Sequence, residues 1–176
     1  MPFVSEVEQQ QASPGLREIY STIEKDFGAL PHFFKALGAT PDVIAAQLQM
    51  NSAIMGDGAL SASVKEQIGL VVSGINSSSY CIAIHMELLQ RFGFDKATGR
   101  KLATNYMNAP VEDKTKALFR FADKLTRKPV EIEQSDVDEV LRAGWTQDAL
   151  RETVLVVAFF NYINRVSFGL GLVPDH

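Results

Sequence analysis

The sequence predicts an all-α fold. Apolar residues recur with helical spacing along most of the chain, and no segment alternates apolar and polar residues as a half-buried strand would. Residue types that begin helices and residue types that end them separate the periodic segments. With 176 residues, 46% of them hydrophobic and 22% charged, the chain can bury a sizeable core. We expect a single helical domain that spans residues 1–176.

The first half of the chain carries helix signals at short intervals. Ser13 stands directly before Pro14, which is tolerated in a first helical turn, and Gly28 can end the helix that follows. The expected segments are 14–27, a short one over 31–38, one from the Thr40-Pro41-Asp42 cap to about Gly56, and one that Ser61 or Ser63 caps and that ends near Ile75.

The second half begins with a run of small polar residues at 76–79, which predicts a turn followed by a helix cap. Gly93 and Gly144 can end helices there, and Asp95 and Thr146 can begin them. The expected segments are 80–92, 95–106, 111–126, 134–143 and 147–168.

The composition disfavours several functional classes. A net charge of -4, a pI near 5.4 and the absence of a long Lys/Arg run argue against nucleic acid as a partner. The longest apolar stretch, around 154–160, is too short to cross a bilayer, and the N-terminal residues do not resemble a secretory signal. A single cysteine excludes an intrachain disulfide and is typical of a reducing compartment. We therefore expect a cytoplasmic protein without membrane or nucleic-acid partners.

The chemistry of the chain is concentrated around its only cysteine. Cys81 and His85 are four residues apart, so they share one face of a helix, one turn from each other. A thiol in the first turn of a helix is stabilised as thiolate by the free N–H groups there, and a nearby imidazole can take its proton. Ser78, three residues before Cys81, can cap the helix or contact the thiol.

A third group comes from the preceding helix. If the segments on either side of the turn near 76–77 form an antiparallel hairpin, Glu66 and His85 lie at similar distances from that turn. Because a helix rises about 1.5 Å per residue, a mismatch of one or two residues moves them apart by only a few ångströms. The spacing therefore predicts a carboxylate–imidazole–thiol relay of Glu66, His85 and Cys81.

Each of these residues also has an ordinary structural interpretation. A lone cysteine among apolar neighbours is often a small buried hydrophobe, and Cys81 fits that description. His85 can be a structural histidine on an amphipathic helix, and Glu66 can face solvent or a helical neighbour.

Two other kinds of site have less support. Glu66, His85 and Ser78 could form a hydrolase triad, but no strand leads into a sharp turn at the serine. His32, His85 and His176 lack the paired spacing of metal ligands. We therefore expect neither a metal nor a cofactor.

A faint internal similarity links the two halves. The Lys-Glu pair at 65–66 and the apolar residues after it correspond to the Arg-Glu pair at 151–152, 86 residues further on, and Ser167 falls at the position of Cys81. Two interpretations stay open: a duplicated helical unit in which only the first copy kept its chemistry, or a chance match of two amphipathic helices.

The residues around the thiol resemble the carboxymuconolactone decarboxylase superfamily, specifically its alkylhydroperoxidase D-like, peroxidase-related branch. That branch carries a Glu, an eleven-residue gap and then C-x-x-C-x-x-x-H. Glu66, Cys81 and His85 match this pattern, and Ser78 stands in place of the first cysteine. The resemblance extends to Phe27-Gly28, Pro31, Phe34 and Pro41 upstream and to 161–165 near the end of the chain.

The resemblance implies an alkylhydroperoxidase D-like helical bundle that forms homo-oligomers, often trimers or hexamers, with its reactive-site core over about 41–105. Dithiol members of the family reduce hydroperoxides: one thiolate attacks the peroxide, and the second resolves the sulfenic acid as a disulfide. Carried over to this chain, Cys81 is the reactive thiol, His85 the relay base and Glu66 its partner.

Ser78 departs from the family pattern, because a hydroxyl cannot form a disulfide and the chain has no other cysteine. Cys81 would be left as sulfenic acid unless an outside thiol reduces it. A one-cysteine peroxidase with an external thiol, pairing of Cys81 across subunits, loss of an ancestral activity and an engineered serine all stay open.

The leading hypothesis is a thiol-dependent hydroperoxide reductase-like antioxidant protein that uses Cys81, His85 and Glu66, a hydroperoxide substrate and an external thiol reductant. The alternatives are a carboxymuconolactone decarboxylase-like lyase and a catalytically inactive oligomeric redox sensor or scaffold. The nearly uniform apolar run at 154–160 suits either a core helix or an oligomer interface.

Overall fold

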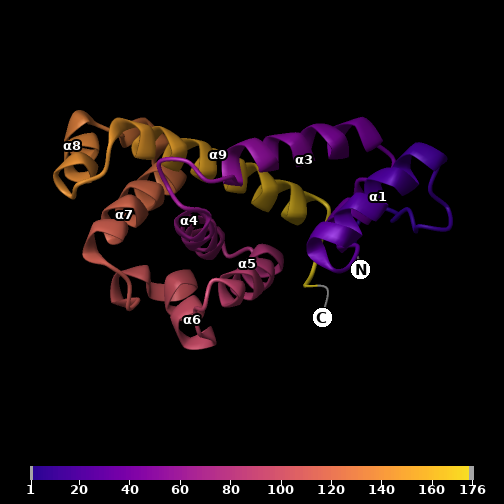
Figure 1. Ribbon diagram of the computed structural model, residues 1–176, viewed down its shortest axis with the longest axis horizontal. Coiled ribbons are helices and arrows are strands. Elements are labelled where there is room, and N and C mark those ends of the chain that lie inside the picture. Colours follow the sequence, from indigo (N-terminus) through magenta and orange to yellow (C-terminus); the bar gives the residue numbers. More distant parts are fainter. Residues whose placement is uncertain (1, 175–176) are drawn as a thin grey trace.

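The computed structural model describes residues 2–174 of the chain, and these residues form helices joined by short connections, with no strand among them (Figure 1). The all-α prediction is confirmed. In chain order the helices are α1 (Pro14–Phe27), α2 (His32–Ala36), α3 (Pro41–Met55), α4 (Ala62–Ile75), α5 (Ser79–Arg91), α6 (Lys96–Asn105), the 3-10 turn η1 (Tyr106–Asn108), α7 (Asp113–Arg127), the 3-10 turn η2 (Pro129–Glu131), α8 (Gln134–Arg142) and α9 (Gln147–Gly169).

Local capping chemistry explains where most of these helices begin. The side chains of Ser13, Ser61, Asp95 and Thr146 each accept a hydrogen bond from the backbone N–H three residues further on. Gly28 ends α1 in the left-handed conformation, with φ of 84°. The sequence predicted these four residues as caps, and the helix boundaries agree within a few residues. Thr40, also predicted as a cap, precedes α3 but makes no side-chain capping bond, because its hydroxyl donates to the Leu37 carbonyl.

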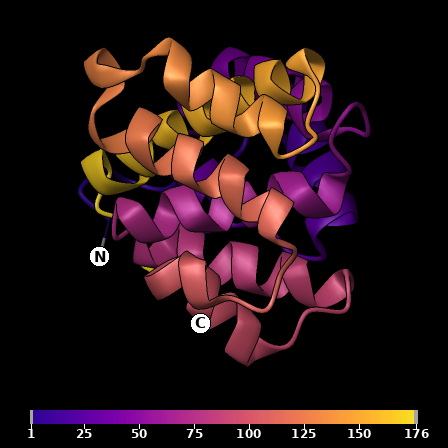
Figure 2. The same ribbon diagram turned by 90° about the vertical axis from the view of Figure 1, so that its left-hand side faces the viewer.

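The helix α4 lies at the centre of the molecule. It packs against α5, α6, α7 and α9, and Figure 1 views it nearly along its axis, with these helices around it. Its middle turns, residues 68–73, are buried on every side. A helix that is apolar all round is stable only where other helices cover it, which fixes α4 as the core element. Figure 2, turned by 90°, shows the same arrangement of helices around α4 from the side.

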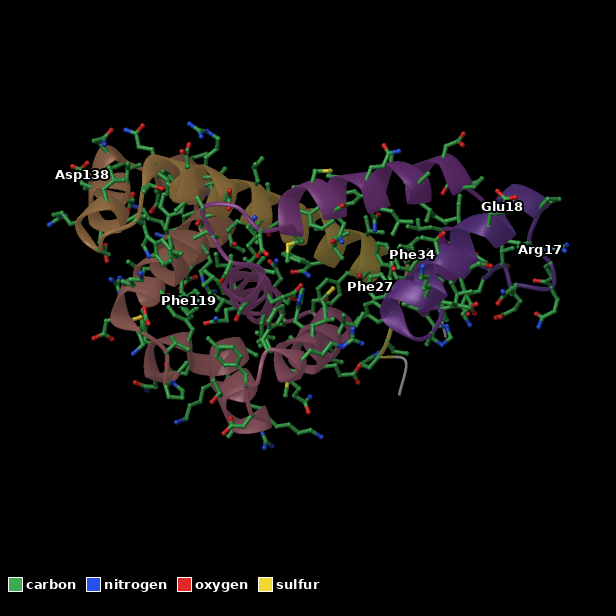
Figure 3. The ribbon with its side chains drawn as sticks, viewed as in Figure 1. Arg17, Glu18, Phe27, Phe34, Phe119 and Asp138 are labelled. Carbon is green, nitrogen blue, oxygen red and sulfur yellow. The ribbon has the colours of Figure 1, made fainter. Side chains whose placement is uncertain are left out.

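The buried side chains form two clusters. The larger one surrounds α4, α7 and α9 and contains Phe119, while the smaller one lies where α1 and α2 meet the beginning of α5 and contains Phe34 and Cys81. Figure 3 shows Phe34 and Phe119 well apart along the molecule. Ile163 of α9 packs against both clusters, so α9 joins the two parts of the core.

A buried lysine holds the loop between α3 and α4. The side chain of Lys65 is 2% exposed; its Nζ donates to the Gly56 carbonyl at 2.6 Å and lies 3.0 Å from a carboxylate oxygen of Glu152. Glu152 also accepts from the backbone N–H groups of Ala59 and Leu60. Desolvation raises the pKa of Glu152, but these backbone bonds and the lysine together lower it. The pair thus ties this loop to α9.

The similarity between residues 65–66 and 151–152 does not mark a second helical hairpin. The helix α9 runs without a break from Gln147 to Gly169, through the positions that correspond to the turn between α4 and α5. The similarity is therefore limited to one helix in the folded chain, and the duplicated helical unit stays a hypothesis. Within residues 2–174, no helix is both long and apolar enough to span a membrane.

Candidate active site

The turn before α5 places Cys81 in a first helical turn. Ser77 adopts a left-handed conformation with φ of 58°, and the N–H of Ser78 donates to the Ser73 carbonyl at 2.9 Å, which closes the turn. The helix then begins at Ser79, so Cys81 is its third residue. Backbone N–H groups of the first turn have no partner within the helix and carry the positive end of its dipole. The location of the thiol is therefore electrostatically suited to an anion.

Glu66 and His85 meet across the α4–α5 hairpin. Nδ1 of His85 lies 2.7 Å from Oε2 of Glu66, and the two side chains are only 5% and 13% exposed. The contact that the sequence predicted is confirmed. A carboxylate can only accept, so Nδ1 donates and the second ring nitrogen, Nε2, is the one left for proton exchange.

The imidazole is also held by packing. The ring of Phe160 meets His85 edge to face, with centroids 4.4 Å apart and planes at 82°. A Cβ at Gly69 would lie 2.9 Å from Cε1 of His85 and 2.8 Å from Cε2 of Phe160. The glycine therefore gives both rings the space to approach α4 and fixes the depth at which the imidazole lies.

The Cys81 thiol, 3% exposed, makes its hydrogen bond to a residue of α9. Its Sγ lies 3.7 Å from Oγ of Ser167, which in turn donates to the Ile163 carbonyl at 2.9 Å. Ser78 occupies the N-cap position of α5, but its side chain makes no capping bond. The prediction that the Ser78 hydroxyl caps α5 is wrong, and the hydroxyl partner of the thiol is Ser167. The side chain at 78 is buried instead, being 1% exposed.

Glu66, Cys81 and His85 line one cavity of about 230 Å³. Its walls are mainly aromatic and aliphatic side chains from α1, α2, α3, α5 and α9, with the amides of Gln47 and Asn51 as additional polar groups. The apolar wall consists of Phe27, Pro31, Phe33, Phe34, Leu48, Ile84, Leu88, Phe159, Phe160 and Ile163. Ser78 does not line this cavity, so the geometry gives no support to a triad of Glu66, His85 and Ser78.

A second cavity, of about 390 Å³, adjoins the first. The two share Phe27, Pro31, Ile84 and Leu88 as lining residues. The second cavity adds more polar groups, including His32, Glu87 and Arg91.

The histidines offer no metal centre in the part of the chain that the structure describes. Nδ1 of His32 pairs with Glu6 at 2.7 Å, and within residues 2–174 no three His, Cys, Asp or Glu side chains are grouped to hold a metal ion. His176 lies outside the described residues.

Sequence reasoning did not identify the aromatic wall of the cavity or the role of α9. Phe159 and Phe160 belong to the apolar run of α9, whose periodicity indicates burial but not a cavity. Tyr80 accepts a hydrogen bond from the backbone N–H of Phe33 at 3.2 Å and so joins α5 to α2. Ser167 was visible only as the counterpart of Cys81 in the internal similarity, and no local pattern predicts their contact.

Solved structures share this helical architecture over nearly the whole chain. An uncharacterised peroxidase-related protein from Silicibacter sp. TM1040 is 27% identical, with a TM-score of 0.87 over 96% of this chain and 90% of that one. The alkylhydroperoxidase AhpD core of an uncharacterised peroxidase-related protein from Ralstonia eutropha JMP134 is 23% identical, with a TM-score of 0.92 over 99% and 92%. The fold is that of an alkylhydroperoxidase D-like helical protein.

The debrominase Bmp8, solved in complex with 2,3,4-tribromopyrrole, is 19% identical, with a TM-score of 0.81 over 96% of this chain and 89% of that one. At this identity the likeness is one of fold. No curated protein sequence matches the chain.

The sequence of the core also matches a known family. Residues 41–124, which contain Glu66, Cys81 and His85, match the model of the carboxymuconolactone decarboxylase family. The predicted resemblance to this family is thereby confirmed over residues 41–124.

Proposed function

We propose that the protein is a thiol-dependent hydroperoxide reductase in which Cys81 attacks the peroxide and an external dithiol restores it. The observation that carries the proposal is the buried Glu66–His85 pair in the same cavity as the only thiol of the chain. A nucleophile, a base and a group that orients the base are the components that covalent catalysis requires.

The first half-reaction consumes one hydroperoxide. The Cys81 proton passes to Nε2 of His85, directly or through a water, while Glu66 stabilises the imidazolium. The thiolate attacks the terminal peroxide oxygen; the S–O bond forms as the O–O bond breaks, and the leaving alkoxide takes the proton from His85. The products are an alcohol and Cys81 as sulfenic acid.

The second half-reaction needs an outside reductant, because Cys81 has no second cysteine in this chain. One thiol of a dithiol displaces water from the sulfenic acid and forms a mixed disulfide with Cys81. The other thiol of the same reductant then releases Cys81 and leaves as a disulfide. The adjoining second cavity offers room for such a reductant next to the site.

The walls of the cavity favour hydroperoxides with an apolar body. Burial of apolar surface contributes about 25 cal/mol per Å², and hydrogen peroxide has no such surface to bury. We expect cumene hydroperoxide to be consumed faster than hydrogen peroxide. The test is peroxide consumption with dithiothreitol by the wild type and by Cys81→Ala. Equal rates in the two proteins would rule out the thiol mechanism.

Reductive dehalogenation is a second candidate, favoured by the aromatic walls around the thiol and by the fold likeness to a debrominase. In that reaction a C–Br bond becomes C–H, bromide and a proton leave, and the two electrons come from the external dithiol, which becomes a disulfide. Release of bromide from 2,3,4-tribromopyrrole with dithiothreitol, and its loss in Cys81→Ala, would favour this function over peroxide reduction.

We also propose that the protein forms homo-oligomers, trimers or hexamers, through the outer face of α3 and α9. Apolar side chains on this face are exposed, among them Val43 and Met50 of α3 and Leu155 and Tyr162 of α9. The two helices lie side by side along one edge of the molecule (Figure 1). Sedimentation velocity at micromolar concentration is expected to show the oligomer, and a monomer alone would contradict it.

A further inference from the structure

We propose that Ser167 is a positioning residue for Cys81: its hydroxyl turns to donate a hydrogen bond to the thiolate and so holds the reactive sulfur in place. The inference rests on the proposed function only in taking the thiolate as the reacting species. It concerns α9, a helix outside the family's Glu–Cys–His pattern and outside the residues 41–124 that match the family model.

Before the Cys81 thiol ionises, the hydroxyl of Ser167 has two hydrogen-bond partners. Its Oγ donates to the Ile163 carbonyl, one turn earlier in α9, at 2.9 Å. A hydroxyl has one hydrogen and two lone pairs, so Ser167 can only accept from the Cys81 thiol, 3.7 Å away. The thiol therefore donates to Ser167 while it keeps its proton.

Loss of the proton reverses this arrangement. A thiolate has nothing to donate and needs donors, and the Ser167 hydrogen can rotate about the C–O bond from the Ile163 carbonyl to the sulfur. The carbonyl keeps the backbone hydrogen bond of the helix, so this rotation leaves no buried acceptor without a partner. A hydrogen bond to the charged form favours that form, so the rotation stabilises the thiolate.

The surroundings of Cys81 make this hydroxyl important. The thiol is 3% exposed and Ser167 is 1% exposed, so bulk water does not replace a missing donor easily. The wall residues from α2, α3 and α9 carry no charge. The titratable groups that line the cavity are Glu66 on α4 and Tyr80 and His85 on α5, and Tyr20 of α1 belongs to the same buried cluster.

The test is the pH dependence of Cys81 alkylation by iodoacetamide, which reads the thiolate population and needs no peroxide. Because the chain has one cysteine, the whole signal comes from this site. In Ser167→Ala we expect the midpoint of the profile to move up by about one pH unit, with about tenfold slower alkylation at neutral pH, since a charge-assisted hydrogen bond is lost. Ser167→Thr keeps the hydroxyl and should restore the wild-type profile.

Thr153 provides a matched control. It is buried on the same helix, and its hydroxyl donates to the carbonyl one turn earlier at 2.8 Å, but the hydroxyl within hydrogen-bond distance of Cys81 is that of Ser167. Thr153→Val is therefore expected to leave the profile of Cys81 in place. An unchanged profile in Ser167→Ala, or a midpoint that moves down, would overturn the proposal.

A second measurement reads the hydrogen bond directly. The infrared S–H stretch of the single thiol should lie at lower frequency in the wild type than in Ser167→Ala, because the thiol donates to Ser167. Equal frequencies would contradict the contact. If the wild type consumes no peroxide while Ser167→Ala still shifts the alkylation profile, the proposed function fails and the role of Ser167 stands. If the wild type consumes peroxide and Ser167→Ala leaves the alkylation profile unchanged, the proposed function stands and only the role of Ser167 is refuted.

Discussion

Replacing Glu66 with Gln removes the charge beside His85 and keeps the size of the side chain. The carboxylate oxygen that lies 2.7 Å from Nδ1 becomes an amide, which stabilises an imidazolium less well. Every step that places a proton on His85 is then slower. We therefore expect Glu66→Gln to fold normally and to consume hydroperoxide more slowly.

The size of the effect follows from the burial of the pair. A hydrogen bond to a charged group contributes about 1.5–3 kcal/mol, against about 0.5–1.5 kcal/mol for a neutral one. The side chains of His85 and Glu66 are 5% and 13% exposed, so solvent screens their interaction little. The amide in Glu66→Gln keeps a neutral hydrogen bond, so the loss in the transition state is the difference, about 1–1.5 kcal/mol, which corresponds to a rate lower by roughly 5- to 13-fold.

The assay is the initial rate of cumene hydroperoxide consumption with excess dithiothreitol. Asp123→Asn is the matched control, because Asp123 accepts a hydrogen bond from the Tyr106 hydroxyl, also at 2.7 Å, but neither residue lines either of the two cavities at the thiol. The control should keep the wild-type rate. A wild-type rate in Glu66→Gln, or an equal loss in both variants, would refute the relay.

Three further predictions concern the site and its support. Ser78→Cys should raise turnover with dithiothreitol by restoring a second thiol three residues from Cys81; unchanged turnover with no disulfide detected by mass spectrometry would contradict this. Gly69→Ala should lower the free energy of unfolding in urea by at most about 2 kcal/mol, since overpacking costs about 1–3 kcal/mol and alanine recovers about 1 kcal/mol of helix propensity. It should nevertheless lower turnover, because the new Cβ displaces the imidazole of His85. Full activity would show that the position of the ring is unimportant. Glu152→Gln should destabilise the protein at neutral pH. Because the folded-state pKa of Glu152 is lowered, the wild type loses this advantage as the pH falls below the ordinary glutamate pKa of 4.5, so the urea midpoints of the two proteins should converge in acid. A constant difference between about pH 7 and pH 3 would contradict the role of the carboxylate.

Local chemistry made most of the fold predictable from the sequence. Ser13, Ser61, Asp95 and Thr146 cap their helices because a hydroxyl or carboxylate before an apolar periodic segment satisfies free N–H groups of the first turn. The Glu66–His85 contact was predictable as well, since a short turn forces two antiparallel helices into register.

The rest of the site depends on contacts between distant segments. Ser167 meets Cys81 only because α9 packs across the beginning of α5, and no spacing rule predicts which face of α9 turns inward. The Ser78 side chain is buried but does not line the cavity, which its spacing from Cys81 alone does not reveal. Phe160 contacts His85 by the same docking of α9.

The central claim is that the fold makes Cys81 a better nucleophile toward hydroperoxides than an ordinary thiol. The direct measurement is the second-order rate constant for Cys81 with cumene hydroperoxide in the folded protein and in the same protein unfolded in urea, followed by trapping of the sulfenic acid. We predict that the folded protein reacts faster. A folded protein that reacts no faster than the unfolded chain would contradict the account.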